Sequence, residues 1–186
     1  MPDPTPIQSS RAPPAVLPPR LTSALPRLKG ESPALAAMTD FTHDNPAIVA
    51  PGRHIDDALR DMIAYGVRAL LVVEDGKVLG LITASDIMGE RPIKFLQNPL
   101  CEGSPCRHKD IHVADIMTPW AELQLIDYDW VSHRATADIA ETLIRTCATH
   151  LLVVERSAQD TGSTLRGLFS RTRLERQLDH ALTDPC

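Results

Sequence analysis

The pentapeptide Leu-Leu-Val-Val-Glu occurs twice in the chain, at residues 70–74 and at residues 151–155. Each copy follows an amphipathic stretch with helical spacing and precedes a short apolar stretch that contains glycine. A duplicated unit uses the same arrangement of elements twice, so an internal repeat constrains the fold more than any single motif. The repeat predicts two copies of one βαββα unit, with a ligand site between or within them.

The first copy begins with a strand and a helix. Residues 47–50 stop at Pro51-Gly52, which predicts a short strand. Apolar residues then recur on one helical face, and Gly66 ends the helix. The apolar positions of this face are Ile55, Leu59, Met62 and Ile63.

A hairpin follows this helix. Residues 69–73 form a continuous apolar run, which indicates a buried strand, and residues 78–83 form the return strand. The Asp-Gly pair at residues 75–76 is a strong signal for a tight hairpin turn. Ser85 or Asp86 is then expected to cap a short helix.

The second copy repeats this order. Its predicted elements are a strand at residues 123–126, a helix at 136–148, a buried strand at 151–154 and a return strand at 165–170. Counting back from the repeated pentapeptide would instead align Ala50 with Val131, so the position of the first strand stays open.

The remaining segments have the composition of a tail and a linker. Nine of the sixteen prolines lie in residues 2–33, which favours an extended tail with polyproline II character; docking to a proline-binding partner is the alternative. A polar segment with Pro and Gly separates the copies. The predicted boundaries are a tail at 1–32, a first domain at 33–97, a linker at 98–111 and a second domain at 112–182.

Charge and apolar content argue against several classes of partner. The formal net charge of -5 argues against non-specific binding to nucleic acid, which needs clustered Lys and Arg. No apolar run is long enough to span a bilayer, and the N-terminus lacks the plan of a secretory signal. Four cysteines do not make a disulfide scaffold, so a reducing cytoplasm is expected.

Three motifs resemble those of a known family: DIMTP at residues 115–119, GVRALLVVEDGKVLG at 66–80 and GLITASD at 80–86. Together with the repeated order of elements, they resemble a tandem pair of cystathionine-β-synthase-type (CBS) domains, or Bateman module, of a stand-alone bacterial type. The resemblance implies an α+β fold of two βαββα domains with pseudo-twofold symmetry, each a small sheet flanked by helices. It also implies a flat homodimer that requires no cofactor and binds AMP, ADP, ATP or S-adenosylmethionine between its domains.

The turn at residues 83–86 is the strongest candidate for a ligand site. A carboxylate at Asp86 can accept hydrogen bonds from both ribose hydroxyls, while Thr83 and Ser85 can donate to phosphate near a helix N-terminus. The family resemblance assigns these roles to Thr83 and Asp86. Helix capping without a ligand is the alternative interpretation.

The second copy departs from this pattern, because Arg173 stands where the first copy has Asp86. Ser170 and Thr172 keep the hydroxyl groups. A guanidinium has no acceptor atom and cannot replace a carboxylate beside a diol. The sequence therefore predicts one nucleoside site, with Arg173 paired to an acidic neighbour or, alternatively, to a phosphate.

The resemblance also implies an apolar wall for the adenine ring. The candidates are Ile48, Val49, Ala69 and Leu70. His150 matches Ala69 in position and is a candidate for contact with a base in the second cleft, with a structural role as the alternative. Arg68, Arg91 and Lys94 are candidates for phosphate contacts or for solvated surface.

The linker contains residue types that zinc prefers, namely Cys101, Cys106, His108 and His112. Only Arg107 separates the two pairs, where a folded zinc module has a longer segment. A plain loop is expected, with a metal site or a disulfide as alternatives. Cys147, beside the apolar stripe of its helix, is expected to be a small core residue.

No nucleophile in the chain is recognisably paired with a base, so catalysis is not expected. The leading hypothesis is a cytoplasmic sensor that binds an adenosine-containing ligand and acts on a downstream protein yet to be identified. The rival hypothesis is a scaffold that only dimerises and recruits a partner through its proline-rich tail.

Overall fold

The computed structural model describes residues 25–97, 107–156, 163–179 and 182. These residues form two four-stranded mixed sheets. The first sheet has the order β2 (Ile48–Val49), β3 (Ala69–Glu74), β4 (Lys77–Thr83) and β5 (Thr118–Pro119). The second has the order β1 (Thr39–Asp40), β8 (Ser163–Ser170), β7 (His150–Arg156) and β6 (Leu125–Asp127).

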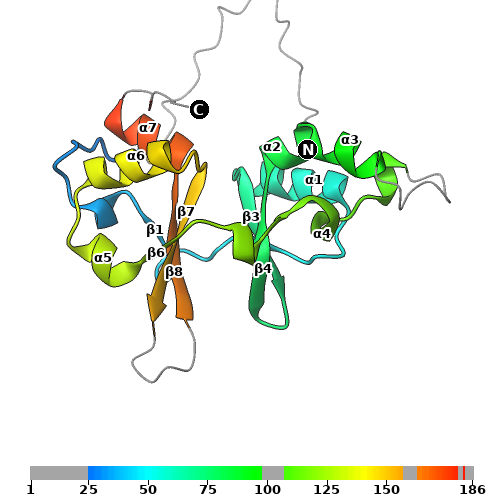
Figure 1. Cartoon of the computed structure of the whole chain (residues 1–186), viewed down its shortest axis with the longest axis horizontal. Helices are drawn as coiled ribbons and strands as arrows, with labels where there is room; N and C mark the ends of the chain where they lie inside the picture. Colours follow the sequence, from blue (N-terminus) through cyan, green and yellow to red (C-terminus); the bar gives the residue numbers. More distant parts are fainter. Residues whose placement is uncertain (1–24, 98–106, 157–162, 180–181, 183–186) are drawn as a thin grey trace, which may run out of the picture.

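Helices cover the outer side of each sheet, and the two sheets meet at the centre of the molecule (Figure 1). Beside the first sheet lie α1 (Ile55–Tyr65), α2 (Ala84–Met88), α3 (Arg91–Leu96) and α4 (Val113–Ile116). Beside the second lie α5 (Tyr128–Ser132), α6 (Thr136–Arg145) and α7 (Arg171–Leu178). Short 3₁₀ turns are η2 (Ala34–Ala36), η4 (His108–Asp110) and η5 (Trp120–Glu122). The predicted α+β fold of two small sheets flanked by helices is confirmed.

None of the helices formed by the described residues is long and apolar enough to cross a membrane.

The predicted hairpin of the first repeat is confirmed. Asp75 and Gly76 have φ angles of 48° and 74°, so both occupy the left-handed region that a tight hairpin turn requires. Glu74 pairs with Lys77 across this turn. The tip of the second hairpin, residues 157–162, lies outside the described residues.

The first strand of each predicted domain pairs with the sheet of the other repeat. Strand β1 lies antiparallel to β8, and β5 lies antiparallel to β4. The contact is close, since a Cβ atom at Gly167 would lie 2.3 Å from the Thr39 carbonyl oxygen, and one at Gly80 would lie 2.4 Å from that of Thr118. The two halves are therefore interlocked, and the sheets do not follow domain boundaries drawn at residues 33 and 112.

The strand predicted at residues 123–126 overlaps β6 of the second repeat. Ile48 lies beside Leu71, and Leu125 lies beside the equivalent Leu152, so β6 is the counterpart of β2. The alternative alignment of Ala50 with Val131 is wrong, because the additional helix α5 follows β6 and contains Val131.

Three apolar cores hold the described residues together. One core lies between each sheet and its helices, and a third joins the sheets through Leu71, Leu81 and Leu152. The predicted apolar face of α1 is partly wrong, since Ile63 is 72% exposed whereas Ala58 is fully buried. Ile63 lies on the same helical face as Leu59, but it faces solvent because no neighbouring described element covers it.

Candidate functional site

Two cavities open where the halves of the molecule meet, and each lies at a strand-to-helix turn. The Asp86 cleft, of about 330 Å³, lies at the turn from β4 to α2 and is lined there by Thr83, Ser85 and Asp86. The Arg173 cleft, of about 340 Å³, lies at the turn from β8 to α7 and is lined there by Ser170, Thr172 and Arg173. The clefts occupy equivalent places in the two repeats.

Thr83 and Asp86 hold each other in a fixed arrangement. The Thr83 backbone N–H and its Oγ1 hydroxyl donate to Asp86 Oδ2 at 2.8 and 2.7 Å, and the Asp86 N–H donates to Thr83 Oγ1 at 3.2 Å. This reciprocal pattern is a capping box. The prediction that Ser85 or Asp86 caps the helix is therefore wrong: Thr83 is the cap, and Asp86 is its partner in the first turn.

Arg91 fixes the other oxygen of the carboxylate. Its Nε lies 3.1 Å from Asp86 Oδ1, while its Nη1 and Nη2 donate to the Ile116 carbonyl and to Thr118 Oγ1. A carboxylate oxygen has two acceptor positions, so Oδ1 can still accept from a ligand hydroxyl. The Asp86 side chain is thus positioned in advance at the wall of the cleft.

The opposite wall of the Asp86 cleft comes from the second repeat. It includes Gln124, Thr146 and His150, and His150 also lines the Arg173 cleft. Burial lowers the pKa of His150 to about 4, although the nearby Asp86 carboxylate partly opposes this shift. The imidazole between the two clefts is therefore neutral at pH 7, with its Nδ1 3.0 Å from Thr149 Oγ1.

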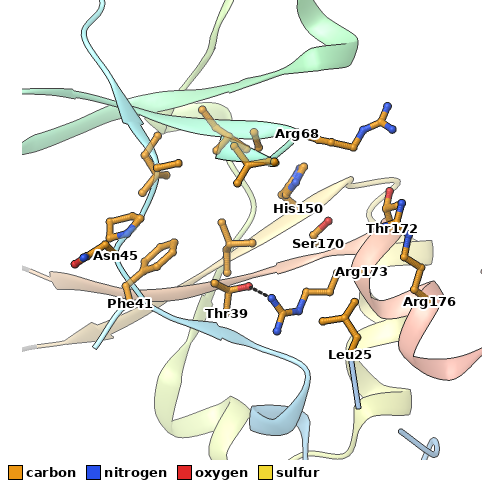
Figure 2. A pocket seen from close by; sticks show the side chains of 18 residues that line it. Leu25, Thr39, Phe41, Asn45, Arg68, His150, Ser170, Thr172, Arg173 and Arg176 are labelled. Carbon is orange, nitrogen blue, oxygen red and sulfur yellow. Dashed lines mark hydrogen bonds between the residues drawn. The ribbon is translucent and has the colours of Figure 1, made fainter. Parts of the chain in front are cut away.

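The Arg173 cleft is completed by the first repeat, which contributes Asn45, Arg68 and Ala69. Arg173 Nη1 donates to Thr39 Oγ1 at 3.2 Å (Figure 2). Within the described residues Arg173 forms no salt bridge, so the predicted acidic neighbour is absent from this part of the chain. The Thr39 hydroxyl on β1 is thus the partner of Arg173, where the sequence predicted a carboxylate.

The predicted ligand-binding residues divide between the two cavities. Thr83, Ser85 and Asp86 share one cleft with His150, and Ala69 lies with Ser170 and Arg173 in the other. Three predicted wall residues line neither cavity: Ile48 is exposed, whereas Val49 and Leu70 are buried in the core beneath the helices. Side chains alternate along β3, so Ala69 and Leu71 face the other sheet while Leu70 faces α1.

Residues of the predicted linker site do not converge in the described part of the chain. Cys101 and Cys106 lie outside the described residues. His108 Nδ1 lies 3.6 Å from Asp56 Oδ1, while the His112 ring stacks on His54 at 4.6 Å. The described residues contain no group of three side chains suited to hold a metal ion. The prediction for Cys147 is wrong, because this residue is exposed and disulfide-bonded.

Several residues of the Asp86 cleft were not predicted from sequence, among them Glu122, Gln124 and Thr146. They belong to the second repeat, whereas the motif that marks the cleft belongs to the first. Each cleft combines the strand-to-helix turn of one copy with the start of the buried strand of the other copy. Alignment of the two copies could therefore have pointed to the residues that precede each buried strand.

Comparison with known proteins agrees with this architecture. Residues 38–92 match the family model of the CBS domain. No curated protein matches the chain. Among solved structures, CBSX2 in complex with AMP is 24% identical with a TM-score of 0.53, over 79% of this chain and 95% of that one.

Two further structures are similar at comparable length. An uncharacterized conserved protein from Pyrococcus horikoshii is 22% identical, with a TM-score of 0.52 over 79% of this chain and 92% of that one. The CBS domain of a bacterial CNNM/CorC family Mg²⁺ transporter, in complex with ATP, is 15% identical, with a TM-score of 0.51 over 81% of this chain and 90% of that one. Residues 38–92 therefore match the CBS domain family, and the described chain has the fold of a tandem CBS pair.

Proposed function

We propose that the protein is a non-catalytic regulatory module that binds an adenosine-containing ligand in the Asp86 cleft. The main observation in support of this proposal is the position of Asp86. Its carboxylate is held by Thr83 and Arg91 at a strand-to-helix turn, inside a cavity that the second repeat completes. The AMP of the CBSX2 structure and the ATP of the transporter domain support the same ligand class.

The chemistry of the cleft suits a nucleoside better than a polyphosphate. Asp86 Oδ1 keeps one acceptor position for a ribose hydroxyl, and Ser85 remains as a hydroxyl donor because that of Thr83 is bonded to Asp86. Among the described residues of the lining, Asp86 and Glu122 supply two carboxylates against the single guanidinium of Arg91. Ligands with less negative charge, such as AMP or S-adenosylmethionine, are therefore favoured over ADP and ATP.

The interlocked halves allow a bound ligand to change how the two repeats pack against each other. A ligand in the Asp86 cleft contacts both repeats, so its binding energy favours whichever packing of the two halves brings these walls closest. No cofactor is required for such a shift. A downstream protein would detect the change in packing, and localisation in the cytoplasm remains a prediction from the sequence.

A homodimer is part of the proposal. The helices beside the first sheet expose Ile63, Met88 and Ile93 at 72, 63 and 59%, respectively. Apolar side chains exposed on neighbouring helices favour contact with a second copy. The same surface would serve the rival function, a scaffold that dimerises without a ligand and recruits a partner through residues 1–31.

Thermal unfolding with AMP, ADP, ATP and S-adenosylmethionine tests the ligand claim. A ligand at a hundred times its Kd stabilises the folded state by about 2.7 kcal/mol, which corresponds to a rise in Tm of roughly 5–10 °C for a chain of this size. We expect Asp86→Ala to abolish this rise, because the variant loses the carboxylate that accepts from the ribose.

Asp138→Ala is the matched control. Asp138 Oδ2 accepts from the Ala135 N–H at the start of α6, so this variant also loses a helix-capping bond but lies outside both clefts. It should keep the full ligand response. An equal response in Asp86→Ala would contradict the assigned site, and no response of the wild type to any ligand would favour the scaffold, whose partner capture should require residues 1–31.

A further inference from the structure

The described part of the chain begins at the Arg173 cleft. Leu25, the first described residue, lines this cavity, and Figure 2 shows its side chain near that of Arg173. The residues that follow are bound to the second repeat, since the Leu28 N–H donates to the Gln177 carbonyl oxygen at 2.8 Å and the Leu28 side chain packs against the core of that repeat. Residues 1–24 therefore join the described structure at the cavity itself.

The cleft offers many hydrogen-bond donors and few acceptors. Its described lining includes three guanidinium groups, those of Arg68, Arg173 and Arg176, and no carboxylate. None of the three forms a salt bridge with a described residue, and the Arg173 Nε is buried without an acceptor among these residues. A buried donor without an acceptor is costly, so the cleft favours an occupant rich in acceptors.

The N-terminal tail has the complementary composition. Residues 1–24 contain seven prolines, and proline has a carbonyl acceptor but no N–H. A polyproline II segment makes no internal hydrogen bonds, so all of its carbonyl oxygens are available to a partner. Residues 17–24, with the sequence LPPRLTSA, also have apolar side chains, which suit the apolar part of the lining formed by residues such as Phe41, Leu81 and Leu168.

We propose that the Arg173 cleft is a docking groove for the N-terminal tail of the same chain, with residues 17–24 as the docked segment. Three residues make one turn of a polyproline II helix, so Pro19 and Thr22 share a face with Leu25, whereas Arg20 lies on another face. The face that continues from Leu25 into the cleft is therefore uncharged, and the guanidinium of Arg20 remains in solvent.

The direct connection makes even a weak contact effective. A segment tethered beside its own groove is present at a millimolar effective concentration. Its carbonyl oxygens accept from Arg68 of the first repeat and Arg176 of the second, which lie on opposite sides of the cleft (Figure 2). The docked tail thus contacts both repeats and excludes other occupants from the Arg173 cleft, while the Asp86 cleft stays open.

Limited trypsin digestion of the full chain, followed by mass spectrometry, tests the docking. Trypsin cuts after Arg11, outside the docked segment, and after Arg20, within it. Cleavage of a segment that opens transiently follows the population of its open form. Relative to Arg11, cleavage at Arg20 should be on the order of tenfold slower in the folded chain than in a synthetic peptide of residues 1–26, which gives the intrinsic ratio of the two sites.

A double variant and a matched control show whether the arginines hold the tail. In Arg68→Gln/Arg176→Gln the ratio should come within about twofold of that of the peptide, because the carbonyl oxygens lose their charged donors. Both residues are exposed, so the substitutions leave the core intact. Arg145→Gln removes an exposed arginine of α6 outside both clefts and should keep the full protection. Steric shielding by the residues that follow the tail would persist in both variants.

Three results would overturn the proposal. The first is wild-type protein in which Arg20 is cut at the ratio of the free peptide. The second is a double variant that is protected as well as Arg145→Gln. The third is protection that rises with protein concentration, which would make the tail of a second copy the occupant. Asp86→Asn should keep the protection, so failure of the nucleoside site can be distinguished from failure of the docking.

Discussion

Phe169→Ala is expected to lower the free energy of unfolding by about 3–5 kcal/mol, which corresponds to a fall in Tm of roughly 6–20 °C. Phe169 is fully buried on β8 and is among the largest side chains of the core between the second sheet and its helices. It pairs with Leu151 of the repeated pentapeptide. The alanine variant loses apolar burial and leaves a cavity that the interlocked strands β1 and β8 cannot easily fill.

Urea unfolding of Phe169→Ala and Tyr65→Ala measures this effect against a matched control. Tyr65 is also aromatic, but its side chain is 63% exposed at the end of α1. Its replacement should change stability by less than about 0.5 kcal/mol. A loss below about 1 kcal/mol for Phe169→Ala would show that Phe169 is not packed in this core.

Acidification from pH 7 to pH 4 is expected to destabilise the protein by up to about 3 kcal/mol through His150 alone. Burial lowers the pKa of His150 from 6.5 to about 4 in the folded chain. The unfolded chain therefore binds a proton near pH 6.5 that the folded chain does not bind until about pH 4. Stability is fully present above pH 6.5 and is lost progressively as the pH falls towards 4.

His150→Gln isolates this contribution from that of the carboxylates, which also titrate in acid. Glutamine keeps a polar side chain of similar size but does not ionise. The free energy of unfolding of the variant, measured in urea at pH 7 and pH 4.5, should fall by less than that of the wild type. Equal losses in the two proteins would contradict a partly buried, neutral His150 between the clefts.

The regular part of the fold could be predicted because it depends on periodic patterns. The hairpin at residues 75–76 and the helix ended by Gly66 are both encoded in neighbouring residues. The exchange of β1 and β5 between the sheets could not be predicted in this way. Each of these strands has only two residues, which is too short for a period of two to appear, and its partner is distant in sequence.

Only the residues of each cleft that lie within one repeat could be predicted from the sequence. Asp86 and Arg173 were recognised because each copy of the repeat can be compared with the other. The partners of Asp86 were missed, since Glu122 and Thr146 become neighbours only when the two halves interlock. Leu70 lies in the core and not at a cleft, and a continuous apolar strand gives no sign of which face its residues occupy.

The two halves thus share a framework but have clefts of opposite charge. This asymmetry predicts that a neutral nucleoside binds at the Asp86 cleft alone, because Arg173 offers no acceptor for a ribose diol. The number of adenosine molecules bound per chain is therefore the quantity that separates one nucleoside site from two.

Equilibrium dialysis with adenosine measures this number directly, because adenosine lacks the phosphates that would bring it to the arginines. The expected result is one adenosine per chain for the wild type and none for Asp86→Ala. Two equivalent sites per chain, or one site that survives Asp86→Ala, would contradict the account.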